Sequence, residues 1–116
     1  VTMKKNEYSI YVIELDKQVL KHKKFKTVNP NYNPKKPCVY VGYTSKSPEV
    51  RFEEHISGAR NKKGRLFNTF AKKYGKRLKP RLFRVHNPMS SVDEAKAMEE
   101  EKARRLRKRG YGVWQN

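Results

Sequence analysis

One carboxylate, Glu99, stands at an unusual place in this sequence. Residues 91–109 repeat apolar side chains at helical spacing, and at about 100° per residue these side chains form one stripe. The stripe contains Val92, Ala95, Ala103 and Leu106. Glu99 falls near its middle, where an isolated carboxylate costs several kcal/mol to bury unless it is paired, protonated or bound to a metal. An ion pair with Arg51 or with an arginine of a sheet is the structural alternative to a functional role.

Four other side chains could act with Glu99 on a phosphodiester. They are Tyr11, Tyr40, Arg51 and His55. A carboxylate can hold a hard divalent cation, an arginine can neutralise charge that grows on phosphate oxygens, and a tyrosine or histidine can take the proton of an attacking water. A lone carboxylate is typical of one hydrated Mg²⁺ or Mn²⁺. Buried tyrosines often only pack, so only the convergence of these side chains would indicate a site.

Two predicted strands and one predicted helix must position these side chains. Residues 8–15, YSIYVIEL, and residues 38–43, CVYVGY, are rich in β-branched and aromatic residues, which predicts strands. If the two strands pair antiparallel, their tyrosines can share one face of the sheet. Ser47 as N-cap and Pro48 at the first helical position predict the helix start that fixes where Arg51 and His55 point.

The rest of the chain predicts two further helices, a third strand and a long loop. Residues 91–109 predict the longest helix, and residues 65–75 predict a shorter one. Residues 80–88, PRLFRVHNP, predict a third strand between two prolines. Residues 16–37, rich in Lys and Pro, predict an extended, mobile basic loop that could contain a short hairpin. The tail is too short for a helix, and we expect Trp114 to fold back onto the core. This order favours an α+β fold with a small antiparallel sheet.

The charge of the chain favours a polyanionic partner. Its 116 residues carry 29 Lys and Arg against 11 Asp and Glu, a formal charge of +18. No apolar run approaches the ~20 residues of a membrane span, and no lipidation segment stands out, so nucleic acid is favoured over a membrane. A single cysteine, Cys38, excludes a disulfide framework and a thiolate zinc site and favours an intracellular setting, cytoplasmic or nucleoid/nuclear. No small-molecule cofactor is indicated.

Basic side chains gather in three stretches that we predict to contact DNA. These residues are Lys23, Lys24, Lys26, Lys35, Lys36, Lys62, Lys63, Arg65, Lys72 and Lys73. In the first stretch Phe25 and Tyr32 lie among the lysines, which favours contact with the DNA backbone and wedging by an aromatic ring. The basic run at the end of the last predicted helix fits a solvated helix face as well as it fits a contact with DNA.

The two strands resemble the first two motifs of the GIY-YIG nucleases. SIYVI at residues 9–13 is similar to the first motif, with Ser9 in the place of its glycine. YVG at residues 40–42 is similar to the second motif, with Val41 in the place of isoleucine. The resemblance implies that Tyr11 and Tyr40 are the motif tyrosines.

The helical residues continue this resemblance. Arg51 and His55 stand in an R-x-x-x-H relation, and Ala95 and Glu99 match an A-x-x-x-E segment. The resemblance implies that Arg51 binds the scissile phosphate, that Glu99 holds the metal, and that a motif tyrosine or His55 activates water. The family often has an asparagine after the glutamate helix, and Asn116 is the candidate downstream.

The resemblance implies a three-stranded antiparallel sheet flanked by about three helices, as one nuclease domain over residues 1–116 with a basic insertion at about 16–37. It implies a DNA endonuclease that depends on Mg²⁺ or Mn²⁺. Two other readings stay open. One is a non-catalytic basic module of the same fold that binds nucleic acid, and the other uses Tyr40 as a covalent nucleophile in strand transfer.

Overall fold

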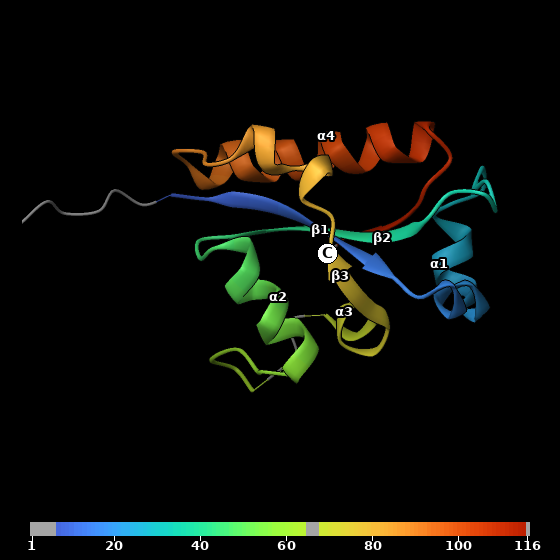
Figure 1. Cartoon of the computed structure of the whole chain (residues 1–116), viewed down its shortest axis with the longest axis horizontal. Coiled ribbons are helices and arrows are strands. Elements are labelled where there is room, and N and C mark those ends of the chain that lie inside the picture. Colours follow the sequence, from blue (N-terminus) through green and yellow to red (C-terminus); the bar gives the residue numbers. More distant parts are fainter. Residues whose placement is uncertain (1–6, 65–67, 116) are drawn as a thin grey trace, which may run out of the picture.

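A computed structural model describes residues 7–64 and 68–115 of the chain, as an α+β fold built on one four-stranded sheet (Figure 1). The strands are β1 Ser9–Leu15, β2 Cys38–Thr44, β3 Gly75–Leu78 and β4 Gly112–Gln115. The helices are α1 Lys23–Thr27, α2 Pro48–Ser57, α3 Thr69–Tyr74 and α4 Val92–Lys108. No helix within the described ranges is long and apolar enough to cross a membrane.

The predicted strands over residues 8–15 and 38–43 are confirmed as β1 and β2. They pair antiparallel, with Tyr11 opposite Gly42 and Tyr40 opposite Ile13. Because side chains alternate along a strand, both tyrosines lie on one face of the sheet, as expected. Nearly every residue of both strands is buried, on either face.

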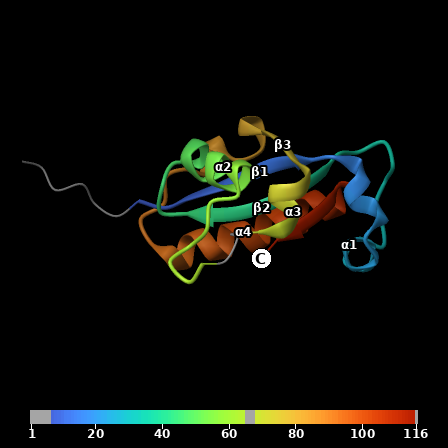
Figure 2. The same cartoon turned by 90° about the horizontal axis from the view of Figure 1, so that it is seen from below.

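Helices cover both faces of the sheet. In Figure 1 α4 lies on one side, and α2 and α3 lie on the other. The view from below in Figure 2 shows α2 and α3 over β1 and β2, with α4 beyond them. Because both faces are covered, a polar side chain on these central strands lies in the interior, where it needs hydrogen-bond partners.

The helix ends follow the sequence signals. Ser47 caps α2 by accepting a hydrogen bond from the backbone N–H of Val50 at 3.1 Å, and Pro48 is its first residue. Gly58 ends α2 in the left-handed conformation, with φ of 75°. Ser91 caps α4 in the same way. The shorter predicted helix is confirmed as α3 from Thr69; residues 65–67 lie outside the described part of the chain.

The prediction of a strand over residues 80–88 is wrong. Two 3-10 turns occupy Pro80–Leu82 and Arg84–His86, and Val85 is 81% exposed. The third strand is β3, which pairs antiparallel with β1 at Ile13–Leu15. Nearer the start of β1, the Asn87 side chain makes the hydrogen bonds that a neighbouring strand would make. It accepts from the N–H of Ile10 at 2.9 Å and donates to the Ile10 carbonyl at 2.8 Å.

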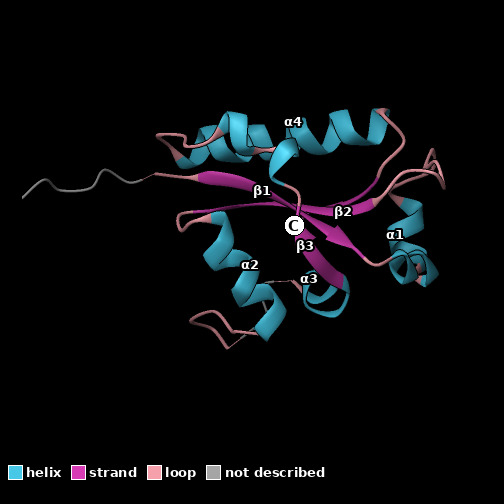
Figure 3. Ribbon diagram, in the orientation of Figure 1, coloured by secondary structure: helices cyan, strands magenta, loops and turns pink. Residues whose placement is uncertain are grey.

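The sheet is mixed rather than three-stranded and antiparallel, because the tail adds the fourth strand. β4 pairs parallel with β2, placing Gly112 beside Cys38 and Gln115 beside Val41. The resulting strand order is β3-β1-β2-β4. Figure 3 labels β1, β2 and β3 of this sheet, with its strands in magenta. As expected, Trp114 packs against the core, and its ring lies 4.9 Å from that of Phe70.

The prediction of an extended basic loop over residues 16–37 is also wrong. The segment holds a 3-10 turn at Lys17–Lys21 and the helix α1. Val19 and Phe25 are completely buried, so the segment adds to the core through them. Phe25 therefore cannot wedge into DNA as the sequence suggested, while the lysines of α1 remain exposed.

Candidate active site

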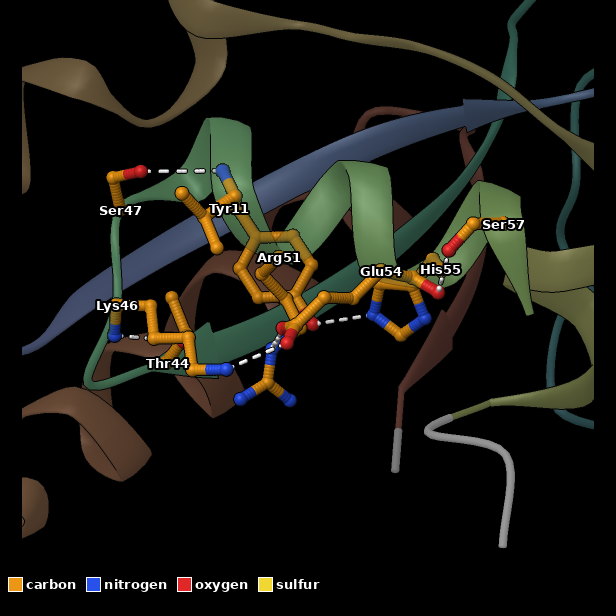
Figure 4. Close-up of polar contacts among 9 residues, drawn as sticks. Tyr11, Thr44, Lys46, Ser47, Arg51, Glu54, His55 and Ser57 are labelled. Atoms are coloured by element: carbon orange, nitrogen blue, oxygen red, sulfur yellow. Dashed lines mark hydrogen bonds and ion pairs between the residues drawn. The ribbon is translucent and has the colours of Figure 1, made fainter. Parts of the chain in front are cut away.

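Three of the predicted site residues form a buried cluster between the sheet and α2. The hydroxyl of Tyr11 shares a hydrogen bond of 2.8 Å with Nε2 of His55 (Figure 4). The ring centroid of Tyr40 lies 6.0 Å from that of Tyr11 and 5.3 Å from that of His55. The exposed fractions of Tyr11, Tyr40 and His55 are 1%, 0% and 2%. The fold therefore brings these three predicted site residues together, and all three are buried in the interior of the protein.

Burial sets the protonation states of this cluster. Desolvation, with Arg51 as a smaller cause, lowers the pKa of His55 to about 4, so its imidazole is neutral near pH 7. Desolvation also raises the pKa of Tyr11 well above its usual value, followed in size by the interaction with Tyr40. A neutral imidazole beside an un-ionised phenol is an arrangement that can accept a proton and pass it along a hydrogen bond.

Gly42 makes room for the ring of Tyr11. A Cβ at this position would lie 2.6 Å from the Tyr11 hydroxyl and 2.7 Å from the carbon that carries it. The hydroxyl end of the ring thus lies over Gly42 of the neighbouring strand. The glycine of the YVG motif is required here by side-chain packing rather than by a turn.

The substitution Gly42→Ala should destabilise the protein by about 2–3 kcal/mol, because the new methyl group overlaps the Tyr11 ring. Urea unfolding measures the change in the free energy of unfolding. The same substitution beside Tyr11→Val should cost much less, since the smaller side chain leaves the space open. Equal costs in the two backgrounds would show that the ring is not the cause.

Arg51 lies on α2 one helical turn before His55, the buried residue of that helix. Its Nε lies 3.1 Å from Oε1 of Glu54, and Lys46 contacts the other oxygen of that carboxylate. The Arg51 side chain is 17% exposed. Figure 4 shows its guanidinium beyond the ring of Tyr11. The Glu54 contact holds the arginine stem in place.

Glu99 lies on the inward face of α4, as the sequence predicts, and is 6% exposed. Burial is the largest cause that raises the pKa of its carboxyl to about 7, and the charge of Glu100 adds to it. Gln115 donates from Nε2 to Oε1 of Glu99 over 3.4 Å, and this weak bond only partly offsets burial. Among the described residues Glu99 forms no ion pair, so the proposed pairing with Arg51 is not what holds it.

Arg51 and Glu99 nevertheless line the same cavity, which we call the Glu99 cavity. Its volume is about 500 Å³, and Tyr43, Thr44 and Ser45 form its wall from the end of β2. β4 pairs with β2 only as far as Val41, so this stretch of β2 has no strand beside it on that side within the described residues. Arg51, on the α2 side of the sheet, and Glu99, on the α4 side, can therefore line one cavity at this open edge.

The donor set of this cavity suits a hard divalent cation that keeps most of its own ligands. Glu99 is a buried carboxylate that no described Lys or Arg pairs with, and Glu100 lines the cavity beside it. No cluster of three or more His, Cys, Asp or Glu side chains that could hold a metal occurs in residues 7–64 and 68–115. One or two carboxylates with water and phosphate oxygens is the ligand set typical of Mg²⁺.

The pKa of Glu99 predicts a pH effect on the metal-free protein. A native pKa of about 7, above the ordinary 4.5, means that Glu99 favours folding at low pH and loses that contribution as pH rises from about 4.5 to 7. In EDTA near pH 8.5, we expect the free energy of unfolding of Glu99→Gln to be about 1–2 kcal/mol higher than that of wild type. Near pH 5 we expect the two free energies to be equal. The difference expected near pH 8.5 is below the ~1.4 kcal/mol per pKa unit because the cavity admits water. Urea unfolding at both pH values tests this, and a difference independent of pH would contradict it.

Gln115 is a site residue that the sequence reasoning missed. Its amide links Glu99 to Arg107, since Nη1 of Arg107 donates to Oε1 of Gln115 at 3.2 Å. That bond turns the amide so that its NH₂ faces Glu99. Gln115 comes directly before Asn116, the downstream candidate, which lies outside the described residues. The signal available was an amide residue shortly after the glutamate helix.

The predicted DNA-contacting lysines lie away from this cavity. They occur on α1, on α3 and in the segments before β2 and after α2, and Arg65 lies outside the described residues. Some rest on aromatic rings: Lys24 Nζ is 4.9 Å from the Phe70 centroid. None of the described ones lines the Glu99 cavity, where the lysine is Lys96.

Comparison with known proteins was made by family and by individual protein. The family described as "GIY-YIG catalytic domain" matches residues 7–112, nearly the whole chain. Neither the curated proteins nor the solved structures gave a match. The matched range includes both tyrosine strands, the arginine helix and the glutamate helix. The chain therefore belongs to the GIY-YIG nuclease family.

Proposed function

We propose that this protein is a metal-dependent endonuclease that hydrolyses a phosphodiester bond of DNA in the Glu99 cavity. The observation that carries the proposal is a buried carboxylate that forms no ion pair with any described residue and that lines one cavity together with an arginine. A hydrated divalent cation would compensate the buried charge of Glu99, and a phosphate bound to that cation would lie within the same cavity as Arg51.

In this proposal Arg51 binds the scissile phosphate and neutralises charge that develops on its oxygens. Glu99 holds Mg²⁺ or Mn²⁺, and the hydrogen bond from Gln115 orients the Glu99 carboxylate. The cation, when bound, supplies positive charge that stabilises the phosphate and the leaving oxygen. The lysines on α1 and α3 and beside them neutralise more distant phosphates, which positions the DNA without reading its sequence.

The buried cluster takes the proton of the attacking water. Tyr11 accepts it at its hydroxyl oxygen while its own proton passes to Nε2 of His55, which is neutral and 2.8 Å away. Tyr40 packs against both rings and fixes their positions. The Tyr11 hydroxyl lies over Gly42, the first residue of β2 beyond its pairing with β4, and this position supports Tyr11 as the member of the cluster that meets the water.

The extent of the unit is part of the proposal. We propose that residues 1–116 act as one nuclease domain in which residues 16–37 are a basic insertion, folded onto the core through Val19 and Phe25.

The test is incubation of wild type with supercoiled plasmid DNA, with Mg²⁺, with Mn²⁺ or with EDTA. Nicked and linear products that require a divalent cation are the expected result. DNA that is shifted in a gel but never cut would instead support the alternative, a basic binding module. A covalent adduct of Tyr40 with DNA would support strand transfer.

A further inference from the structure

A second cavity lies at the other end of α4, beside the segment that precedes β2. We call it the Arg107 pocket. Its volume is about 350 Å³, and its walls include Asn29, Tyr32, Arg104, Arg107, Lys108 and Tyr111. No residue lines both this pocket and the Glu99 cavity. In Figure 1 the segment before β2 and the C-terminal end of α4 lie side by side, and Figure 2 agrees.

The pocket holds a positive charge that the described residues do not neutralise. Arg107 is half-buried, and burial lowers its pKa. Its guanidinium donates only to neutral oxygens: Asn29 Oδ1 at 3.3 Å, Gln115 Oε1 at 3.2 Å and the Val113 carbonyl at 3.0 Å. These bonds use three of its five N–H groups. No carboxylate of a described residue lines the pocket, so a bound anion would supply the partner for this charge.

Two aromatic rings stand beside this charge and are held in fixed positions. The Tyr32 hydroxyl donates to the carbonyl of Lys36 at 2.7 Å. Tyr111 lies near two cations, with Lys36 Nζ 5.8 Å and Arg109 Cζ 5.5 Å from its ring centroid. Fixed rings next to arginine and lysine are the combination that binds unpaired nucleotides, with the base stacked on the ring and the phosphate on the cation.

We propose that the Arg107 pocket binds one nucleotide of an unpaired DNA strand, its phosphate on Arg107 and Lys108 and its base against Tyr32 or Tyr111. A paired base is stacked inside the duplex and cannot enter, so the pocket would distinguish a single-stranded segment from a continuous duplex. The inference deepens the proposed function and rests on it for the identity of the substrate.

The position of the pocket fits one strand that also reaches the Glu99 cavity. Lys96 and Glu100 line that cavity, while Arg104 and Arg107 line the pocket. At about 100° per residue these four side chains lie along one stripe of α4, and at 1.5 Å per residue the two pairs are only about 12 Å apart. A strand lying along this stripe would therefore be cut a short distance from the nucleotide in the pocket.

The test measures binding without cleavage, by fluorescence anisotropy in EDTA, with a short oligothymidine and with a blunt duplex. Tyr111→Ala should weaken binding of the single strand about tenfold and leave duplex binding unchanged, because it removes a stacking surface. Tyr111→Phe keeps the ring and should bind like wild type. Equal binding of the single strand by wild type and Tyr111→Ala, or equal losses for both DNAs, would overturn the proposal.

Matched charge reversals and a crosslink complete the test. Lys108→Glu should weaken single-strand binding more than Arg105→Glu, which changes the charge equally in the same helical turn but lies outside the pocket. An oligonucleotide carrying 5-iodouracil should crosslink wild type at Tyr32 or Tyr111, and crosslinks found only elsewhere would contradict the pocket. None of these measurements needs cleavage, so a failed nuclease proposal and a failed pocket proposal give different results.

Discussion

Glu99→Gln should reduce Mg²⁺-dependent plasmid nicking by about 1,000-fold. The amide keeps the shape of the side chain but cannot carry the negative charge that holds a divalent cation, and a cation at a phosphate contributes several kcal/mol to the transition state. Gel analysis of supercoiled, linear and branched DNA measures the loss.

Binding of DNA should survive this substitution, because Glu99 repels phosphates in the absence of metal and the basic residues that bind them are unchanged. Anisotropy in EDTA is expected to show equal or tighter binding. Glu101→Gln is the matched control, since Glu101 lies on the same helix but pairs with Arg104 and Arg105 at the surface. Undiminished nicking by Glu99→Gln would exclude Glu99 as the metal ligand.

Arg51→Ala should slow nicking by about 100- to 1,000-fold, because removing one donor aimed at a developing oxyanion typically has an effect of this size. Arg51→Lys keeps the charge and should recover part of the rate. Recovery should be incomplete because an ammonium group cannot make the planar, bidentate contact with phosphate that a guanidinium makes. Single-turnover rates at saturating enzyme separate this effect from weaker binding.

Lys46→Ala controls for the loss of charge near Glu54. Lys46 contacts the same carboxylate as Arg51, but it does not line the Glu99 cavity. We expect Lys46→Ala to change nicking less than threefold, as is common for an exposed ion pair. If both alanine variants lost activity equally, the role of Arg51 would be to hold Glu54 rather than to bind phosphate.

The parts of the fold that the sequence predicts well are those with strong local signals. β1 and β2 have dense β-branched and aromatic composition, and α2 and α4 begin at a serine cap. These four elements carry all five predicted site residues, so the order of the motifs was enough to place them.

The missed elements depend on partners far away in the sequence. β3 and β4 have four residues each, too few for a periodic pattern, and exist because β1 and β2 offer free edges. Residues 80–88 have strand composition, but β3 and the Asn87 side chain already occupy the edge of β1. The Lys- and Pro-rich composition of residues 16–37 hid the two buried apolar residues, Val19 and Phe25, that fold the segment onto the core.

For the site, the sequence identified residue types but not their surroundings. It predicted the buried position of Glu99 from helical spacing, and it could not show that Tyr11, Tyr40 and His55 are more deeply buried than Arg51. Gln115 was missed because its contact with Glu99 exists only once β4 has paired with β2.

The complete burial of Tyr11, Tyr40 and His55 constrains how this protein can evolve. In the mechanism that we propose, the same three side chains belong both to the reactive groups and to the core, so the core cannot be repacked for stability while the reactive groups stay untouched. Apolar replacements that improve packing would remove the proposed proton path, and polar replacements that alter reactivity would leave unsatisfied groups in the interior. If this mechanism operates, selection on activity and selection on stability act on the same positions, and stabilising changes must accumulate elsewhere in the chain.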